Sequence, residues 1–438
     1  MPVLEVADLK VELRTPSGLL HAVRGTSFAV EKGETLALVG ESGSGKTMTA
    51  LALLDLMPRN GRRMAARIAL DNVEIGSLDE AGLRRVRGGS AAMIFQEPMT
   101  ALNPVFPIGD QMTEGLLVHR PATAWAEAER RAIELLERCG VTEPVRRLRQ
   151  FPHELSGGLR QRVMIATALM TDPSLLIADE PTTALDVTIQ AQILDLLREI
   201  QRERDLAILF ITHDLVLVET FAHRVAVMYA GEIVEQGPTV AVIGSPQHPY
   251  TRRLIACAPS LRAGRGHRLG FLSGLPPRLV GALAGCQFRF RCSDAVSACV
   301  GDILSHRTAA GVSYRCVHPP GALAVKTPQS AAAAGNAAPA VAAPLLEVEN
   351  VSVEYRLRGG LFQRGVPLRA VRKASLSITQ GGVLALVGES GSGKSTLARV
   401  ILGLERPLAG RVTLAGQPLL ALDRRARARA VQPVFQDP

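Results

Sequence analysis

The sequence predicts an α/β fold in which a phosphate-binding turn, placed between a buried strand and a helix, occurs twice. The string LALVGESGSGK is present without a change at residues 36–46 and again at 384–394. In both copies an apolar run suits a buried strand, the glycines suit a tight turn, and an apolar-rich helical pattern follows. Two further apolar runs, LLIADE at 175–180 and LAILFIT at 206–212, predict more buried strands in the first half of the chain.

Both copies contain the pattern G-x-x-x-x-G-K-[ST], which is the Walker A motif. One such match in a glycine-rich chain could be an ordinary turn, but two identical copies between a strand and a helix argue against that. Glycines let backbone N–H groups turn toward phosphates, the lysine reaches the β- and γ-phosphate oxygens, and the Ser or Thr that follows ligates Mg²⁺. The predicted ATP-binding residues are Gly40, Ser42, Gly43, Gly45, Lys46 and Thr47 in the first copy and Gly388, Gly393, Lys394, Ser395 and Thr396 in the second.

Length and composition exclude several classes of protein. With 438 residues, of which 47% are hydrophobic, the chain can bury sizeable cores, and we expect about two to four domains. The net charge is +9, but the arginines are scattered and aromatic residues are few, which favours solvated helix faces over a nucleic-acid groove. No apolar run approaches the roughly 18 residues of a membrane helix, and the N-terminus lacks a secretory apolar stretch. The sequence therefore predicts a cytosolic protein that associates with a membrane only peripherally.

The first half begins with strand patterns and continues with helical ones. Residues 3–30 alternate apolar and polar around a turn at 16–18, which predicts antiparallel strands beside the phosphate-binding core. Two short strands are expected at 68–70 and 73–75. The run AAMIF at 91–95 then places Gln96 at the end of a buried strand, and residues 109–149 have a helical pattern.

The string FPHELSGGLRQR at 151–162 predicts a second phosphate-binding element. Two glycines open a predicted helix over 159–170, and the free N–H groups and dipole at its start would face outward. Ser156 and this backbone would hold a phosphate. The alternative interpretation is a plain turn between two helices.

Polar side chains follow the two apolar runs of the first half. LLIADE places Asp179 and Glu180 at the carboxyl end of a strand, where ligands bind in open α/β sheets. One carboxylate can hold Mg²⁺ and the other can polarise an attacking water, although two acids after a strand also often just begin a loop. LAILFIT then presents His213, and we expect this strand to lie beside the Asp179 strand. A histidine there is more consistent with function than with a structural role.

Taken together, residues 1 to about 235 resemble a complete nucleotide-binding domain of an ABC transporter. The matching motifs are Walker A (40–47), the Q-loop (Gln96), the LSGG signature (155–158), Walker B (175–179), Glu180, the D-loop (184–186) and the switch His213. The resemblance implies a RecA-like core, an antiparallel β-subdomain and a helical signature subdomain. It also implies catalytic roles for Glu180, His213 and Gln96, Mg²⁺ ligation by Thr47, Gln96 and Asp179, and ATP contacts from Ser156, Gly157, Gly158 and Asp186.

The strings IFQEPMTALNPVFPIGDQ, FPHELSGG and HPYTRRLIACAP further resemble the branch that imports oligopeptides, dipeptides or nickel. What this branch implies is ATP hydrolysis that drives uptake of such solutes at the cytoplasmic face of the plasma membrane. The implied partners are two integral-membrane permease subunits, an external solute-binding protein indirectly, and a second ATPase domain in trans, with no nucleic acid. One departure concerns adenine stacking, for which the family commonly has an aromatic residue in the second strand. The second half has Tyr355 there, but the first half has Leu13.

A cysteine-containing extension follows the predicted ATPase domain. Cys286, Cys292, Cys299 and Cys316 are spaced C-x5-C-x6-C-x16-C, and four thiolates in one segment can hold an iron–sulfur cluster or zinc. The spacing matches neither a zinc ribbon nor a ferredoxin run, but the importer branch is similar here. We therefore expect a metal centre, with [4Fe-4S] ahead of zinc. The alternative is reduced thiols without metal, and Cys139 and Cys257 are expected to be core residues.

The second half repeats the start of the first. After an Ala- and Pro-rich stretch, LEVENVSVEY at 346–355 repeats LEVADLKVEL at 4–13, and the sequence ends at PVFQDP before any signature, Walker B or switch His. The predicted organisation is an ATPase domain at 1–239, the extension at 240–320, a linker at 321–344 and a truncated second ATPase domain at 345–438. Because neither ATP site is complete within the chain, we expect hydrolysis to require a missing tail or the pairing of two chains.

Three alternatives stay open. The cargo could be nickel or glutathione rather than peptide, since these importers share the motifs. A soluble ABC ATPase that acts on nucleic acid or the ribosome would have the same ATP motifs, but it would usually carry insertions that this sequence lacks. A catalytically inactive remnant is the third alternative, because the second half is incomplete.

Overall fold

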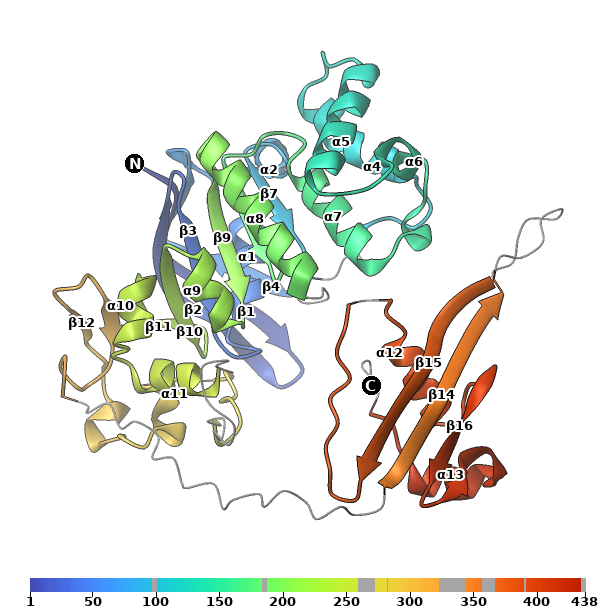
Figure 1. Ribbon diagram of the computed structural model, residues 1–438. Coiled ribbons are helices and arrows are strands. Elements are labelled where there is room, and N and C mark those ends of the chain that lie inside the picture. The colour runs from blue at the N-terminus through green and yellow to red at the C-terminus, as the bar shows by residue number, and fades with distance from the viewer. Residues whose placement is uncertain are drawn as a thin grey trace. The chain divides into compact units, whose positions relative to one another are not determined.

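The computed structural model describes residues 1–96, 101–182, 187–258, 272–281, 283–322, 344–356, 367–389 and 391–434 (Figure 1). The chain divides into two compact units. Unit 1 consists of Met1–Leu185 and Ile189–Ala331, and unit 2 of Asp186–Thr188 and Ala332–Pro438. No helix among the described residues is long and apolar enough to span a bilayer.

The N-terminal strands of unit 1 form an antiparallel sheet, as predicted. β1 (Pro2–Thr15) pairs with β2 (Gly18–Glu31), and the predicted turn lies between them. The sheet order is β2-β1-β5-β6, with β5 at Arg67–Leu70 and β6 at Val73–Glu74, and β4 (Gly61–Met64) also pairs with β1. Alternate apolar side chains of β1 are buried, which fixes the face that the strand turns to the core.

A mixed eight-stranded sheet forms the centre of unit 1, in the order β12-β13-β11-β10-β3-β9-β8-β7. Its strands are β3 (Thr35–Val39), β7 (Ala91–Ile94), β8 (Leu175–Asp179), β9 (Ala207–Thr212), β10 (Arg224–Tyr229), β11 (Glu232–Pro238), β12 (Ser305–Arg307) and β13 (Ser313–Arg315). The strands β10, β3, β9, β8 and β7 run parallel to their neighbours in this row. Every residue of β3, β8 and β9 is buried, as expected of strands covered on both faces.

Alternate side chains of β8 contribute to two different cores. Leu176 and Ala178 pack into a core shared with the helices α4, α5 and α7, whereas Leu175 and Ile177 pack into a core shared with α1 and the antiparallel sheet. Both faces of the sheet are therefore covered by apolar cores. Polar functional side chains are expected instead at the edge formed by the ends of the strands.

The helices predicted after the first loop, within residues 109–149 and after the signature glycines are present in unit 1, together with others that were not predicted. They are α1 (Lys46–Leu53), α2 (Glu80–Val86), α4 (Ile108–His119), α5 (Trp125–Arg138), α6 (Pro144–Leu148), the 3-10 helix η1 (Pro152–Glu154), α7 (Gly157–Ala168), α8 (Val187–Arg204) and α9 (Leu215–Phe221). Figure 1 shows α4, α5, α6 and α7 gathered as a helical group. α7 starts two residues before the predicted 159–170 because the Ser156 side chain accepts a hydrogen bond from Leu159 N–H and caps it there.

The extension is joined to the central sheet. Its elements are α10 (Thr239–Gly244), α11 (Pro249–Cys257), the 3-10 helices η2 (Gln287–Arg291) and η3 (Ser297–Val300), and the strands β12 and β13. β13 pairs with β11, so this segment extends the sheet of unit 1 instead of forming a separate unit. Cys139 is buried, as expected, and burial raises its pKa to about 12, whereas Cys257 is partly exposed.

His248 caps α11 from a fully buried position: its Nδ1 accepts a hydrogen bond from Tyr250 N–H at 3.0 Å. Burial lowers the pKa of His248 from 6.5 to about 3. Between these two values the unfolded state binds more protons, so stability is lost as the pH falls below 6.5. From pH 7 to pH 5 we expect this group to remove about 2 kcal/mol from the free energy of unfolding.

Urea unfolding at pH 7 and pH 5 checks this value. His248→Asn keeps a capping oxygen but does not titrate, so it should lose about 2 kcal/mol less than the wild type over this range. The exposed His153, replaced in the same way, should leave the pH dependence unchanged. Equal pH dependence of the wild type and His248→Asn would contradict the assignment.

Unit 2 contains one antiparallel sheet of order β15-β14-β16-β17 among its described residues. Its elements are β14 (Pro344–Arg356), β15 (Pro367–Thr379), α12 (Lys394–Ile401), β16 (Ala409–Leu414), β17 (Gln417–Pro418), the 3-10 helix η4 (Leu419–Ala421) and α13 (Arg424–Ala430). β14 and β15 repeat the predicted pairing of β1 and β2. Most of the predicted linker at 321–344 lies outside the described residues, and the proposed domain boundaries stay predictions.

The prediction of a buried strand before the second Walker A motif is wrong. The described residues 382–389 adopt no strand, and Val383 and Val387 are 99% and 84% exposed. In unit 1 the same letters form β3 because β9 and β10 pair with it on both sides. Among the described residues of unit 2, the only sheet is β15-β14-β16-β17, and none of its strands pairs with this run.

Candidate active site

The predicted catalytic residues of unit 1 converge on one edge of the central sheet. Asp179 on β8 is in register with Ile211 on β9, which confirms that the His213 strand lies beside the Asp179 strand. β7 lies on the other side of β8 and is followed by Gln96, and β3 lies beside β9 and is followed by Gly40. Because all four strands are parallel, their carboxyl ends meet at the same edge.

The loop after β3 has the conformation that its glycines allow. Gly40 and Gly45 have φ values of 157° and 103°, and a Cβ at Gly40 would overlap the Met228 carbonyl oxygen. Gly45 precedes α1, so the N–H groups of the first turn of α1 point toward the loop. Lys46 bends back over the loop, and its Nζ donates to the carbonyl oxygens of Gly40 at 2.8 Å and Glu41 at 3.0 Å.

Lys46 and Asp179 carry opposite charges in a buried setting. They are 6% and 1% exposed. Burial lowers the pKa of Lys46, although the carboxylates of Glu180, Asp179 and Glu41 oppose this shift. Burial also raises the pKa of Asp179, while a hydrogen bond from Thr47 opposes it. Both groups therefore gain from a ligand of the opposite charge, which a magnesium-bound phosphate supplies.

The residues present fit a magnesium ion. Asp179 Oδ1 is buried and has no hydrogen-bond partner in the described part of the chain, and an acceptor in that position costs free energy unless a ligand satisfies it. Thr47, which hydrogen-bonds to Asp179, supplies a second oxygen beside it. These are the oxygen donors that Mg²⁺ prefers.

Glu180 lies between two of the other predicted catalytic side chains. Its Oε2 accepts from Gln96 Nε2 at 3.3 Å, and its Oε1 lies 3.1 Å from His213 Nδ1. Its φ of 47° is unusual for a residue other than glycine, and its backbone N–H donates to Ile211 O at 2.9 Å. Backbone strain that the neighbouring strand holds in place is common at functional sites.

The signature segment forms the predicted helix start, with Ser156 and Gly157 exposed and Gly158 partly exposed. Sequence reasoning missed Gln161 on the same helix. Its Nε2 donates to Pro181 O, directly after Glu180, at 2.5 Å, and thereby links α7 to the catalytic edge. Its position five residues after Ser156, within the string FPHELSGGLRQR, is the sequence feature that could have indicated its role. Asp186, predicted to contact ATP, lies outside the described residues.

The second copy of the loop has different surroundings. Lys394 Nζ donates to Gly388 O at 2.6 Å and Glu389 O at 2.7 Å, much as Lys46 does, but Lys394 lies near the surface. As predicted, Gly393 directly precedes α12, and Ser395 and Thr396 lie in its first turn. Tyr355 on β14 packs against the core of unit 2, and the corresponding Leu13 packs against a core of unit 1. The structure brings no carboxylate corresponding to Asp179 or Glu180 near Lys394 within the described part of unit 2.

The four cysteines of the extension line one small cavity of about 10 Å³. Burial raises the pKa of Cys286, Cys292 and Cys316, that of Cys292 to about 11, so these thiols are protonated at neutral pH. Among the described residues, no group of three or more His, Cys, Asp or Glu side chains is arranged to hold a metal ion. The thiols thus share a site without forming a ready ligand set.

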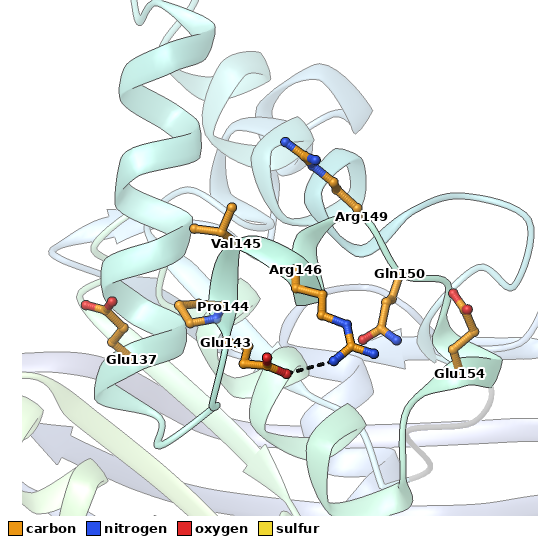
Figure 2. A pocket seen from close by; sticks show the side chains of 8 residues that line it. All are labelled: Glu137, Glu143, Pro144, Val145, Arg146, Arg149, Gln150 and Glu154. Carbon is orange, nitrogen blue, oxygen red and sulfur yellow. Dashed lines mark hydrogen bonds and ion pairs between the residues drawn. The ribbon is translucent and has the colours of Figure 1, made fainter. Parts of the chain in front are cut away.

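A cavity of about 630 Å³ lies in the helical group (Figure 2). Its lining residues are Glu137, Glu143, Pro144, Val145, Arg146, Arg149, Gln150 and Glu154. Within it, Arg146 Nη1 pairs with Glu143 at 2.9 Å. Glu154 is followed directly by the signature segment, so a partner that occupies this cavity would contact residues leading into α7.

Comparisons with known protein families agree with this geometry. The sequence matches the ABC transporter family over residues 23–183 and 371–438. Residues 234–299 match the family described as oligopeptide/dipeptide transporter, C-terminal region.

Three relatives illustrate the similarity. The chain is 43% identical over 451 residues to the oligopeptide transport ATP-binding protein OppD of Mycobacterium bovis, covering 100% of this chain and 73% of that protein. It is 49% identical over 309 residues to a putative peptide import ATP-binding protein of Brucella melitensis, covering 68% of this chain and 91% of that protein. It is 40% identical over 446 residues to the glutathione import ATP-binding protein GsiA of Escherichia coli O157:H7, covering 100% of this chain and 64% of that protein.

A solved structure is also similar. The dimeric structure of MJ0796, a bacterial ABC transporter cassette, matches with a TM-score of 0.50 and 26% identity. The match covers 54% of this chain and 98% of that one.

Proposed function

The chain belongs to the ABC transporter family, and from this premise we propose that it is the ATP-hydrolysing subunit of an importer for oligopeptides or dipeptides. The observation that carries the proposal is the sheet edge at which Lys46, Asp179 and Glu180 meet. The match of the extension to a peptide-transporter region supports the cargo class.

In the proposed reaction, the residues of unit 1 bind ATP and direct an attacking water. The first loop and the start of α1 bind the phosphates, and Lys46 leaves its carbonyl partners to contact the β- and γ-phosphates. Glu180 polarises the water. Gln96 and His213, one on each carboxylate oxygen, hold Glu180 in orientation.

Magnesium would be held by Thr47, Gln96 and Asp179. When bound, the ion neutralises charge on the β- and γ-phosphate oxygens. Asp179 must be ionised to hold the cation. Burial raises its pKa, and a bound cation would oppose this shift and favour the ionised form.

Membership of the family supports the partners proposed next. We propose that the exposed signature segment around Ser156 faces the ATP site of a second ATPase domain, from another copy or a related chain. Two integral-membrane permease subunits, with a solute-binding protein outside, would complete an importer at the cytoplasmic face of the membrane. The cavity beside Glu154 leads into the signature helix, so we propose it as a surface through which a permease acts on α7.

Reconstitution tests the proposed function. We expect the full chain, assembled with its permease subunits in liposomes, to take up labelled oligopeptide only with Mg-ATP, and we expect solute to raise phosphate release. The family relative that imports glutathione makes glutathione a second candidate, to be tested in the same vesicles. Nickel uptake, or salt-sensitive binding of nucleic acid without vesicle transport, would contradict peptide import.

We also propose that Cys286, Cys292, Cys299 and Cys316 hold a metal centre, with an iron–sulfur cluster ahead of zinc. The support is that all four thiols line one cavity, although that cavity has room for roughly one water and a four-iron cluster would require the thiols to move apart. Metal binding requires deprotonated thiols, so it should weaken as the pH falls.

Anaerobic purification followed by absorbance spectroscopy and iron, sulfide and zinc analysis separates the outcomes. We expect a broad band of visible absorbance and about four irons per chain for a [4Fe-4S] cluster. Cys316→Ser should lose the metal, whereas Cys139→Ser, in the helical group, should retain it. Metal-free protein from anaerobic cells would contradict the proposal.

A further inference from the structure

A buried arginine of the extension reaches the first phosphate-binding loop. Arg291, the last residue of η2, donates from Nη1 to Glu41 Oε2 at 2.6 Å and from Nη2 to Glu41 Oε1 at 2.9 Å. The Arg291 side chain is 5% exposed and that of Glu41 is 24% exposed. Glu41 is the second residue of the first Walker A motif. A two-point pair of this kind fixes orientation as well as charge.

Arg291 is itself held from several sides. Its Nε donates to Ser273 O at 2.9 Å, and its own carbonyl oxygen accepts from Arg253 Nη1 at 2.6 Å. The guanidinium also lies over the Tyr229 ring, 5.8 Å from its centroid. The side chain is therefore preorganised and needs little ordering when it pairs with Glu41.

A second contact comes from the start of α11. The hydroxyl oxygen of Tyr250 accepts from Glu41 N–H at 2.9 Å. Tyr250 is fully buried, and its ring packs against Tyr229 and Phe288 with centroids 4.6 and 5.4 Å away. This hydroxyl is thus placed by packed aromatic rings that the extension and β10 supply together.

All the polar groups of Glu41 are consequently engaged. Tyr250 binds its N–H, Arg291 its carboxylate, and Lys46 its carbonyl oxygen at 3.0 Å. Without Arg291, the Glu41 carboxylate would be left as an unpaired, half-buried anion near Lys46. Such an anion would compete with phosphate for the lysine and repel the phosphates directly.

The second copy of the string offers an internal comparison. Glu389 and the apolar residues before it are exposed in unit 2, although the letters around them are the same as those around Glu41. The surroundings of the first loop are therefore provided by residues far away in the sequence, among them Arg291 and Tyr250.

We propose that Arg291 and Tyr250 are positioning residues of the ATP site, which make nucleotide affinity at the first loop depend on the extension. They hold Glu41, and through it the loop and Lys46, in the geometry that receives the phosphates. This inference rests on the proposed binding of ATP at Lys46, but it adds a region outside the catalytic motifs to that site.

A double-mutant cycle on the full chain tests this inference. Arg291→Gln is expected to raise KM for ATP roughly tenfold while kcat changes less than about threefold, because it leaves an unpaired carboxylate beside the phosphates. Glu41→Gln combined with Arg291→Gln should recover much of this loss, since neither charge then remains. Tyr250→Phe, which removes only the hydroxyl, should raise KM about threefold.

Arg315→Gln is the matched control. It breaks an arginine–glutamate pair with Glu232 at 3.1 Å between β13 and β11, so it should leave KM unchanged. Thermal unfolding of every variant separates positioning from stability. The inference is overturned if Arg291→Gln and Tyr250→Phe lower Tm without changing KM, or if the effects of Arg291→Gln and Glu41→Gln simply add. If Lys46→Ala also left nucleotide binding intact, the proposed function itself would fail instead.

Discussion

Replacing Lys46 with alanine is expected to reduce ATP hydrolysis by roughly 10²- to 10³-fold or more, whereas Lys394→Ala should change it less than about twofold. Lys46 is buried beside Asp179 and Glu180, so it acts where charge develops on the phosphates. Lys394 is partly exposed, and no carboxylate corresponding to Asp179 or Glu180 lies near it within the described residues of unit 2.

Phosphate release at saturating Mg-ATP measures this difference, and the two substitutions are matched because they fall in the same eleven letters. Fluorescent-nucleotide binding by each variant shows whether the remaining loop retains ATP. Equal losses of activity from the two substitutions would mean that both loops take part in hydrolysis, which would contradict the assignment of hydrolysis to the first loop.

Glu180→Gln should lower hydrolysis by roughly 10²- to 10³-fold while nucleotide affinity stays within about threefold of the wild type. The substitution keeps the size of the side chain and removes the charge that polarises water. Gln96 and His213 contact the two oxygens of Glu180, so they can still hold the amide in place. The expected loss is therefore chemical and not a loss of binding.

Glu232→Gln is the control for Glu180→Gln, because Glu232 is a partly buried acid in ion pairs with Arg24 and Arg315. It should keep hydrolysis within about twofold of the wild type. Single-turnover phosphate release, started from the ATP-bound protein, isolates the chemical step. Glu180→Gln protein that retains more than a tenth of the wild-type rate would exclude Glu180 as the group that polarises water.

Much of the candidate site was predictable because its parts follow local rules. A buried strand, a glycine turn and a helix start make a phosphate loop recognisable without its surroundings, and Asp179 and Glu180 were correctly assigned to a strand end. The start of α7 is set locally as well, by the Ser156 side chain that caps it. The two apolar runs 175–180 and 206–212 were also expected to form neighbouring strands, and β8 and β9 do pair with each other.

Contacts between distant residues were not predictable in this way. Glu41 and Arg291 are 250 positions apart, and neither the HPY string nor the glutamate of the loop indicated that they meet. The cysteines show the same limit. Their spacing suggested a metal site, and folding does bring them to one cavity, but the ligand arrangement depends on backbone positions that spacing does not define.

The repeated string LALVGESGSGK separates the two sources of information most clearly. By itself, the sequence determined the loop, its helix start and the bend of both lysines toward the loop carbonyls. Only the tertiary structure decided that the first apolar run is a buried strand and the second is not. A strand needs partners for its backbone hydrogen bonds: β9 and β10 supply them in unit 1, and the described part of unit 2 does not.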